Sequence, residues 1–138
     1  MTAVTTDAFF KGRVRLIQPA KGFRAGTDSL LLAAAFDADQ RGTALDIGCG
    51  AGGALVPAAF RVGGTQFTGL EIDADMAALA HKSVNANAMH DRVEIVQASA
   101  AQLPDAWQNR FDTVFSNPPF FDPGTIQAPG AGKEAAYL

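Results

Sequence analysis

The stretch Ser116-Asn117-Pro118-Pro119-Phe120 places an amide and an aromatic ring on either side of two prolines. It follows FDTVF, an apolar run that is typical of a buried strand. Because proline donates no backbone N–H, the strand must end at this point. The Asn117 side-chain oxygen and the Pro118 carbonyl are acceptors that proline rigidity would keep in place, and Phe120 offers a flat face for stacking.

A second candidate site is the run LDIGCGAGG, with glycines at positions 48, 50, 52 and 53. Such glycines let the backbone turn sharply and approach a ligand closely, and the helix that follows presents free N–H groups. Asp46 lies inside the preceding strand, where a carboxylate is unfavourable unless a ligand or backbone donors satisfy it. With Gly48, Gly50, Gly53 and then Glu71, the run also fits the dinucleotide fingerprint, so an NAD oxidoreductase is one alternative.

The elements that must position these residues alternate along the chain between strand and helix patterns. Apolar runs predict strands at 43–49, 65–72, 93–98 and 111–116, and an alternating segment at 13–18 predicts a further strand or hairpin arm. Helical patterns cover 28–36, 53–62, 73–88 and, as a short helix, 100–108, with Thr27 or Asp28 and Asp73 as candidate N-caps. The alternation predicts an α/β fold, in which a parallel sheet has helices on both faces and binds ligands at the carboxyl ends of its strands.

Composition limits the class of protein. The 138 residues are 48% hydrophobic and 18% charged, which fits one soluble globular domain. The longest apolar run, LLLAAAF, is too short to cross a bilayer, so we expect a cytoplasmic protein without a membrane partner. Cys49 is the single cysteine, which excludes an intrachain disulfide, and His81 and His90 have no metal-ligand spacing beside it.

Charge is distributed unevenly, although the formal net charge is −3. Residues 1–24 hold five of the eleven Lys and Arg residues and one of the fourteen Asp and Glu residues. We therefore predict a basic N-terminal arm or hairpin over residues 1–26. A local basic patch attracts phosphate groups and favours an RNA partner, while a solvated arm explains the same charges equally well.

Taken together, the motifs resemble a known family. DIGCGAGG followed by GLEID resembles motif I and the acidic end of strand two in class I S-adenosylmethionine-dependent methyltransferases, which have a Rossmann-like three-layer sandwich fold. SNPPF resembles the catalytic NPPY/F motif of the branch that methylates amino groups. LIQPAKGFRAGTDSLLLAAAF, placed before these motifs, is similar to the opening segment of the bacterial tRNA(Val) N6-adenine methyltransferase family. The resemblance runs from about Arg13 to Asp122 and implies a core that binds S-adenosyl-L-methionine over residues 27–138.

The resemblance also implies a role for individual residues in binding the cofactor. Gly48, Gly50 and Gly52 would lie under the methionine moiety, with Asp46 directed toward the cofactor through water or backbone groups. Glu71 would accept hydrogen bonds from the ribose hydroxyls, Ile72 would pack on the adenine, and Ser99 stands where the family often has an acid near the adenine amine.

The catalytic roles follow from the same resemblance. Asn117 and Pro118 would hold the two hydrogens of the target amine, with Asn117 also beside the cofactor, and Phe120 would stack on the flipped base. Arg24 and Thr27 could line the entrance to the site or stabilise the helix start.

The resemblance leaves some alternatives open. The family sheet has seven strands in the order 3-2-1-4-5-7-6, and this chain supplies four, so we expect a sheet truncated after strand four, with an open edge that favours self-association. The favoured function is N6-methylation of adenine in tRNA or another RNA. The same motif also fits methylation of a protein glutamine or of guanine N2 in ribosomal RNA, and the missing strands allow a non-catalytic cofactor-binding fragment.

Overall fold

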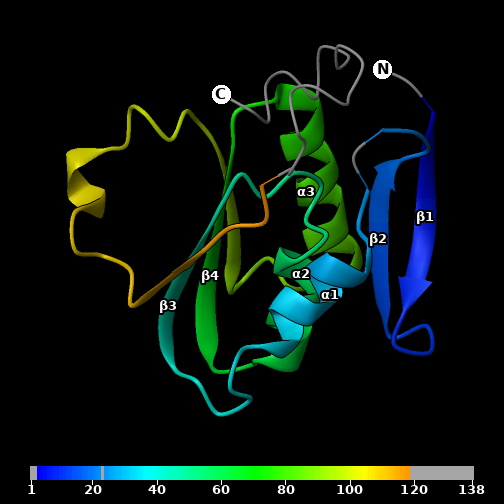
Figure 1. Cartoon of the computed structure of the whole chain (residues 1–138), viewed down its shortest axis with the longest axis horizontal. Coiled ribbons are helices and arrows are strands. Elements are labelled where there is room, and N and C mark those ends of the chain that lie inside the picture. Colours follow the sequence, from blue (N-terminus) through cyan, green and yellow to red (C-terminus); the bar gives the residue numbers. More distant parts are fainter. Residues whose placement is uncertain (1–2, 23, 119–138) are drawn as a thin grey trace, which may run out of the picture.

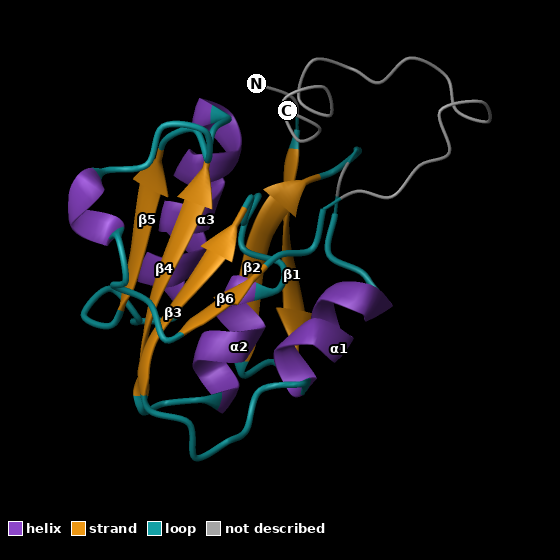
Figure 2. Ribbon diagram, turned by 60° about the vertical axis from the view of Figure 1, so that its left-hand side comes forward, coloured by secondary structure: helices purple, strands orange, loops and turns teal. Residues whose placement is uncertain are grey.

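In the computed structural model, which describes residues 3–22 and 24–118, four parallel strands form one sheet (Figures 1 and 2). The strands are β3 (Gly42–Ile47), β4 (Thr65–Glu71), β5 (Val93–Gln97) and β6 (Thr113–Phe115). They lie in the order β5-β4-β3-β6, which is the 3-2-1-4 order that the resemblance implied. The four predicted strands and the α/β fold are therefore confirmed, and β6 is shorter than the predicted 111–116.

The direction of each crossover explains which face of the sheet a helix covers. The connections from β3 to β4 and from β4 to β5 run the same way, so right-handed crossovers place α2 (Leu55–Arg61) and α3 (Ala74–Ala86) on one face. The connection from β5 to β6 runs the opposite way and crosses the other face, where it holds only the 3-10 helix η1 (Asp105–Trp107) (Figure 1). Helices were expected on both faces, but all three α-helices of the described residues lie on one face, because η1 replaces the short helix expected at 100–108.

A hairpin lies on the far side of these helices from the sheet (Figure 1). It consists of β1 (Val4–Phe9) and β2 (Val14–Pro19), which are antiparallel, so the segment predicted at 13–18 is the second strand of this hairpin. Two polar side chains on or just after α3 satisfy the free edge of β2. The Ser83 hydroxyl accepts a hydrogen bond from the Ile17 N–H, and the Asn87 amide bonds both the N–H and the carbonyl of Arg15.

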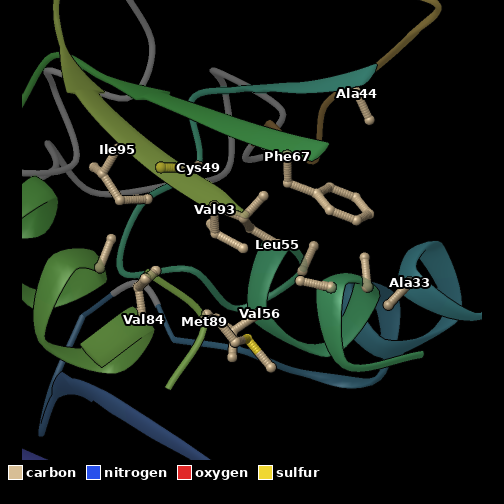
Figure 3. Close-up of a cluster of buried hydrophobic side chains, with 14 of the residues drawn as sticks. Ala33, Ala44, Cys49, Leu55, Val56, Phe67, Val84, Met89, Val93 and Ile95 are labelled. Carbon is tan, nitrogen blue, oxygen red and sulfur yellow. The ribbon is translucent and has the colours of Figure 1, made fainter. Parts of the chain in front are cut away.

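The hydrophobic core lies between the sheet and the helices (Figure 3). Phe67 on β4 and Leu55 and Val56 on α2 are almost completely buried, and each contributes about 1.5–3 kcal/mol to stability by leaving water. Phe67 also joins Phe36 and Phe115 in an aromatic cluster with ring centroids 4.8–6.4 Å apart. Since Phe115 is the last residue of β6, this cluster fixes the strand that leads to the Asn-Pro corner.

The helix starts differ in how they are capped. The Asp73 carboxylate accepts a hydrogen bond from the Met76 N–H at 3.0 Å, so the predicted cap of α3 is confirmed. The cap predicted for α1 (Thr27–Ala34) was wrong, because Gly26 occupies the N-cap and has no side chain that could bond a free N–H group. Asp28 bonds the neighbouring Ser29 N–H instead.

Two features concern the surface of the molecule. No strand of residues 3–22 or 24–118 pairs with the outer edge of β6, where Val114 is 56% exposed. Self-association through this edge stays a prediction. None of the helices in these residues is long and apolar enough to cross a membrane.

Candidate functional site

The glycine loop and the Asn-Pro corner meet at the point where the sheet topology reverses. β3 pairs with β4 on one side and with β6 on the other, and ligands bind in such sheets at the carboxyl ends of the strands beside this switch. The register pairs Asp46 with Phe115. Gly48 and Asn117 each lie two residues further on, so the two motifs leave neighbouring strands at the same level.

A cleft opens at this point and is lined by residues from five parts of the chain. They come from β2 and the segment after it, from α1, from β3 and its glycine loop, and from the regions of α3 and the Asn-Pro corner: Gln18, Arg24, Ala25, Ser29, Asp46, Gly48, Cys49, Gly50, Ala51, Gly53, Ala54, Met76 and Asn117. The structure therefore brings together Asp46, Gly48, Gly50 and Asn117 among the predicted site residues.

The backbone of the glycine loop explains its composition. Gly48, Gly50 and Gly52 all have positive φ angles, of 72°, 57° and 99°, which other residues rarely adopt. The Gly48 N–H donates to the carbonyl of Leu70 at 2.8 Å, and the Gly50 N–H donates to the Glu71 carboxylate, also at 2.8 Å. The loop is thus bonded to the end of β4 by hydrogen bonds within the chain.

Glu71 is a buried structural acceptor in this arrangement. One carboxylate oxygen accepts from the Gly50 N–H and the other from the Asp73 N–H, each at 2.8 Å, and the residue is 6% exposed. Glu71 does not line the cleft. Each carboxylate oxygen has a second lone pair, so the predicted contact with ribose hydroxyls stays chemically open and is a prediction.

Asp46 is an acidic residue in the wall of the cleft. It is 2% exposed, and no hydrogen bond reaches its carboxylate from the part of the chain that the structure describes. Burial, and secondarily the negative charge of Glu71, raise the pKa of Asp46 well above its ordinary value. A cationic group bound in the cleft would relieve both effects, because it would pair with the carboxylate.

Cys49 lies beside Asp46 but has no nucleophilic character. Burial, and then the charges of Asp46 and Glu71, raise the pKa of its thiol well above the ordinary value. The thiol therefore keeps its proton, which agrees with the role of a small filler in the core.

The Asn-Pro corner is anchored by two hydrogen bonds. The Ser116 hydroxyl donates to the Ile47 carbonyl at 2.8 Å, which ties the corner to the end of β3. The Asn117 side-chain nitrogen donates to the Ser29 hydroxyl of α1 at 3.1 Å. The Asn117 side-chain oxygen has no hydrogen-bond donor among residues 3–22 and 24–118, so it is the end of the amide that can accept from a ligand.

The other predicted site residues do not line the cleft. Ile72 follows β4 and is 42% exposed, and Pro118 is exposed next to Asn117. Ser99 is partly buried, and its hydroxyl accepts from the Ala101 N–H. Gly52 is a buried residue of the glycine loop and does not line the cleft, while Phe120 lies outside the described residues.

The segment between the hairpin and α1 forms the wall of the cleft that sequence reasoning largely missed. Of the two residues considered there, Arg24 lines the cleft, whereas Thr27 is exposed and does not. Ser29 and Ala25 were not considered. Ser29 had one available signal, because a serine in an otherwise apolar helix that packs on a core needs a hydrogen-bond partner when it is buried.

Arg24 belongs to a polar network that joins the hairpin to this wall. Its guanidinium pairs with Asp7 at 3.1 Å and donates to the Pro19 carbonyl. Gln18 donates to Asp7 at 2.8 Å and accepts from the Ala25 N–H at 3.0 Å. Hydrogen bonds from Gln18 and Thr5, together with Arg24, lower the pKa of Asp7 below its ordinary value.

Comparison with known proteins identifies the family. Residues 21–129 match the family model described as the methyltransferase small domain. The chain belongs to this family. The resemblance to class I methyltransferases that the motifs indicated is thereby confirmed, together with the Rossmann-like fold.

Individual relatives of this methyltransferase small domain agree with that assignment. The chain is 27% identical to the tRNA1(Val) (adenine(37)-N6)-methyltransferase of Photorhabdus laumondii over 96% of its length and 53% of the relative. It is 34% identical to the protein of the same name from Porphyromonas gingivalis, over 95% of this chain and 54% of that relative. The solved structure of P. horikoshii TYW2 in complex with MeSAdo matches this chain with a TM-score of 0.68 at 16% identity. The match covers 83% of this chain and 42% of the TYW2 chain, so the two proteins share the fold. The chain spans about half the length of the curated relatives it matches.

Proposed function

We propose that this methyltransferase small domain binds S-adenosyl-L-methionine and transfers its methyl group to N6 of an adenine in tRNA. The observation that carries the proposal is the cleft itself. It combines the buried Asp46 carboxylate, which has no partner among the described residues, with the Asn117 amide, whose nitrogen bonds Ser29 and whose oxygen has no donor among the described residues. A site that binds a cationic donor and orients an amine needs both features.

The cleft residues fit this cofactor. Its amino acid portion carries an ammonium group, and its sulfur is positively charged, so the Asp46 carboxylate gains a partner of opposite sign. The left-handed backbone at Gly48 and Gly50 leaves no side chain between the loop and the ligand. When bound, S-adenosylmethionine supplies a methyl group from a sulfonium whose sulfur keeps the electrons of the broken bond.

The residues of the Asn-Pro corner then act on the amine. An amine conjugated to a base is a poor nucleophile, because its lone pair is delocalised into the ring. The Asn117 side-chain oxygen and the Pro118 carbonyl oxygen accept hydrogen bonds from the two N–H groups of the amine and direct its lone pair toward the methyl carbon. The same oxygens stabilise the positive charge that develops on nitrogen, and the excess proton leaves to water after transfer. No general base is needed.

The choice of tRNA rests on the relatives and on charge. The relatives from Photorhabdus laumondii and Porphyromonas gingivalis are named as tRNA1(Val) adenine methyltransferases. The hairpin also exposes Lys11, Arg13 and Arg15, which can attract phosphate groups. The Asn-Pro corner would also suit methylation of the side-chain amide of a protein glutamine or of guanine N2 in ribosomal RNA. A protein that binds the cofactor without catalysing methyl transfer is the non-enzymatic alternative. An NAD oxidoreductase would leave the Asn-Pro corner without a role.

The variant Asn117→Ala tests this function, with Asn85→Ala on the exposed face of α3 as the matched control. Calorimetric titration measures binding of S-adenosylhomocysteine, with NAD as a second ligand, and radiolabelled S-adenosylmethionine reports methyl transfer to tRNA. We expect Asn117→Ala to lose transfer by at least about a hundredfold while its Kd for S-adenosylhomocysteine stays within about threefold, because the amide acts mainly on the amine. Unchanged transfer in Asn117→Ala would refute the mechanism, and binding of NAD alone would refute the cofactor.

A further inference from the structure

Gln18 is a buried cleft residue whose side-chain amide can bind in one orientation only. Its Oε1 accepts from the Ala25 N–H at 3.0 Å, and its Nε2 donates to the Asp7 carboxylate at 2.8 Å. Hydrogen bonds, first of all the one from Gln18, lower the pKa of Asp7, which is therefore ionised near neutral pH. A backbone N–H can only donate and an ionised carboxylate can only accept, so exchanging the two ends of the amide would break both bonds.

The Ala25 end of this link lies directly against the glycine loop. A Cβ added to Gly53 would lie 2.9 Å from the Ala25 Cβ and 3.3 Å from the Ala25 Cα, so the two residues are in close contact. Both of them line the cleft. A shift of Ala25 away from Gly53 would widen the cleft at this point, and the hydrogen bond from Gln18 opposes that shift.

Arg24, the neighbouring residue of the cleft wall, is tied to the same carboxylate. Its guanidinium pairs with Asp7 at 3.1 Å and donates to the Thr5 hydroxyl, also at 3.1 Å. The Thr5 hydroxyl in turn donates to Asp7 at 2.7 Å. Oδ2 of Asp7 thus accepts from Thr5, Gln18 and Arg24, and joins two cleft residues to the hairpin.

We propose that Asp7 is a positioning residue for cofactor binding, which holds the wall formed by Arg24 and Ala25 against the glycine loop. This inference rests on the proposed binding of S-adenosylmethionine in the cleft. Asp7 does not line the cleft, so it acts on the cofactor through Gln18 and Arg24 and not by contact. A wall that is already in place needs less ordering when the ligand binds. Loss of the link should therefore weaken binding, while the transfer step at the Asn-Pro corner stays unchanged.

The test reverses the hydrogen bond between Gln18 and Asp7. Gln18→Glu places a carboxylate oxygen opposite that of Asp7, and two acceptors facing each other repel. Adding Asp7→Asn supplies an amide N–H group that can donate to the new carboxylate. The matched control adds Asp75→Asn instead, which removes an exposed acid in the first turn of α3 without restoring this bond.

Calorimetric titration at pH 8, which keeps the new carboxyl group ionised, measures the Kd for S-adenosylhomocysteine. Gln18→Glu should raise this Kd about tenfold, the effect of losing one hydrogen bond. KM for S-adenosylmethionine should rise in proportion, and kcat should stay within about twofold. Adding Asp7→Asn should return Kd to within about threefold of the wild type, whereas adding Asp75→Asn should leave it raised. Because Asp7 does not line the cleft, changing it could not restore a lost contact between Gln18 and the ligand.

A second variant tests the same link without changing a cleft residue. Asp7→Ala removes the shared acceptor at a partly exposed position, where the fold should persist, and should raise Kd by about threefold to tenfold. Its matched control is Glu94→Ala, which removes the acid of the exposed ion pair with Arg110 and should leave Kd unchanged. Circular dichroism checks that each variant is folded.

The opposite results would overturn the inference. If Asp7→Asn does not lower the Kd of Gln18→Glu, or if Asp75→Asn lowers it equally, Asp7 does not act through Gln18. An unchanged Kd in Asp7→Ala has the same meaning. A wild-type chain that binds no S-adenosylhomocysteine refutes the proposed function and the positioning role together. A wild type that binds this ligand but methylates no RNA refutes only the proposed transfer, and the Kd values still decide the role of Asp7.

Discussion

The substitution Asp46→Asn should make the free protein more stable while it weakens cofactor binding. Asp46 is 2% exposed and has no hydrogen-bond donor within residues 3–22 and 24–118, and burial raises its pKa. Asn would place an equally polar but uncharged amide at this position, so the gain is the penalty for ionising the buried carboxylate, about 1.4 kcal/mol for each unit by which its pKa is raised. With an unfolding entropy of about 2.1 cal/mol/K per residue, the 138 residues unfold with about 0.29 kcal/mol/K, so each 1.4 kcal/mol should raise Tm by about 5 °C near pH 8.

The pH dependence of this effect has a definite sign. Because the pKa of Asp46 is raised in the folded state, the folded protein holds a proton that the unfolded chain releases above about pH 3.9. Wild-type stability therefore falls as pH rises through this window, by up to about 1.4 kcal/mol per pH unit, and the Asn variant lacks this slope. The difference in Tm between the two proteins should be small at pH 4 and largest at pH 8.

Thermal unfolding of both proteins across this pH range, with and without S-adenosylhomocysteine, checks the prediction. The ligand should raise the Tm of the wild type more than that of Asp46→Asn, because the variant lacks the charge that pairs with the ligand's ammonium group. A variant that is less stable than the wild type at pH 8, or a difference in Tm that does not change with pH, would mean that the carboxylate is satisfied in the free protein. In that case Asp46 would be a structural residue.

Two further substitutions test how the loop is held. Glu71→Gln should lower the free energy of unfolding, measured in urea, by about 1–3 kcal/mol. The reason is that an amide NH2 group replaces one of the two oxygens that accept hydrogen bonds from the Gly50 and Asp73 N–H groups. An unchanged midpoint of urea unfolding would contradict this prediction. Gly53→Ala should lower the free energy of unfolding by about 1–3 kcal/mol, since the new Cβ would lie 2.9 Å from the Cβ of Ala25. Adding Ala25→Gly to this variant should restore most of the loss. If the effects of the two substitutions simply add, the two sites do not touch.

Much of the fold followed from local patterns in the sequence. The four strands of the sheet are apolar runs bounded by glycine or polar residues, and their order follows once the crossovers are right-handed. The segment between β5 and β6 was harder to predict, because it forms only η1 and is stabilised by side-chain contacts that follow no helical periodicity. Trp107 packs edge-on against Phe111 there, with the Arg110 guanidinium over both rings. Such a cluster stabilises an irregular segment without periodicity, so a sequence pattern cannot reveal it.

The site was predictable only where its residues lie at strand ends. The glycine loop and Asn117 follow apolar runs, Asp46 is the second-last residue of β3, and parallel strands bring such ends together. The wall made by Arg24, Ala25 and Ser29 could not be found this way, because it depends on how the hairpin docks. That docking is set by contacts between residues far apart in sequence, such as those of Asn87 with Arg15.

The two bonds of Glu71 change how any loss of cofactor binding in a Glu71 variant must be interpreted. The residue was predicted as a ribose acceptor, yet both of its oxygens already accept hydrogen bonds from backbone N–H groups, at Gly50 and at Asp73. Weaker binding in Glu71→Gln could therefore arise from a displaced loop, a lost ribose contact, or both. The free-protein unfolding energy separates these effects, because only the loop bonds exist without ligand. If binding falls by more than the loss of loop stability explains, the excess measures the ribose contact.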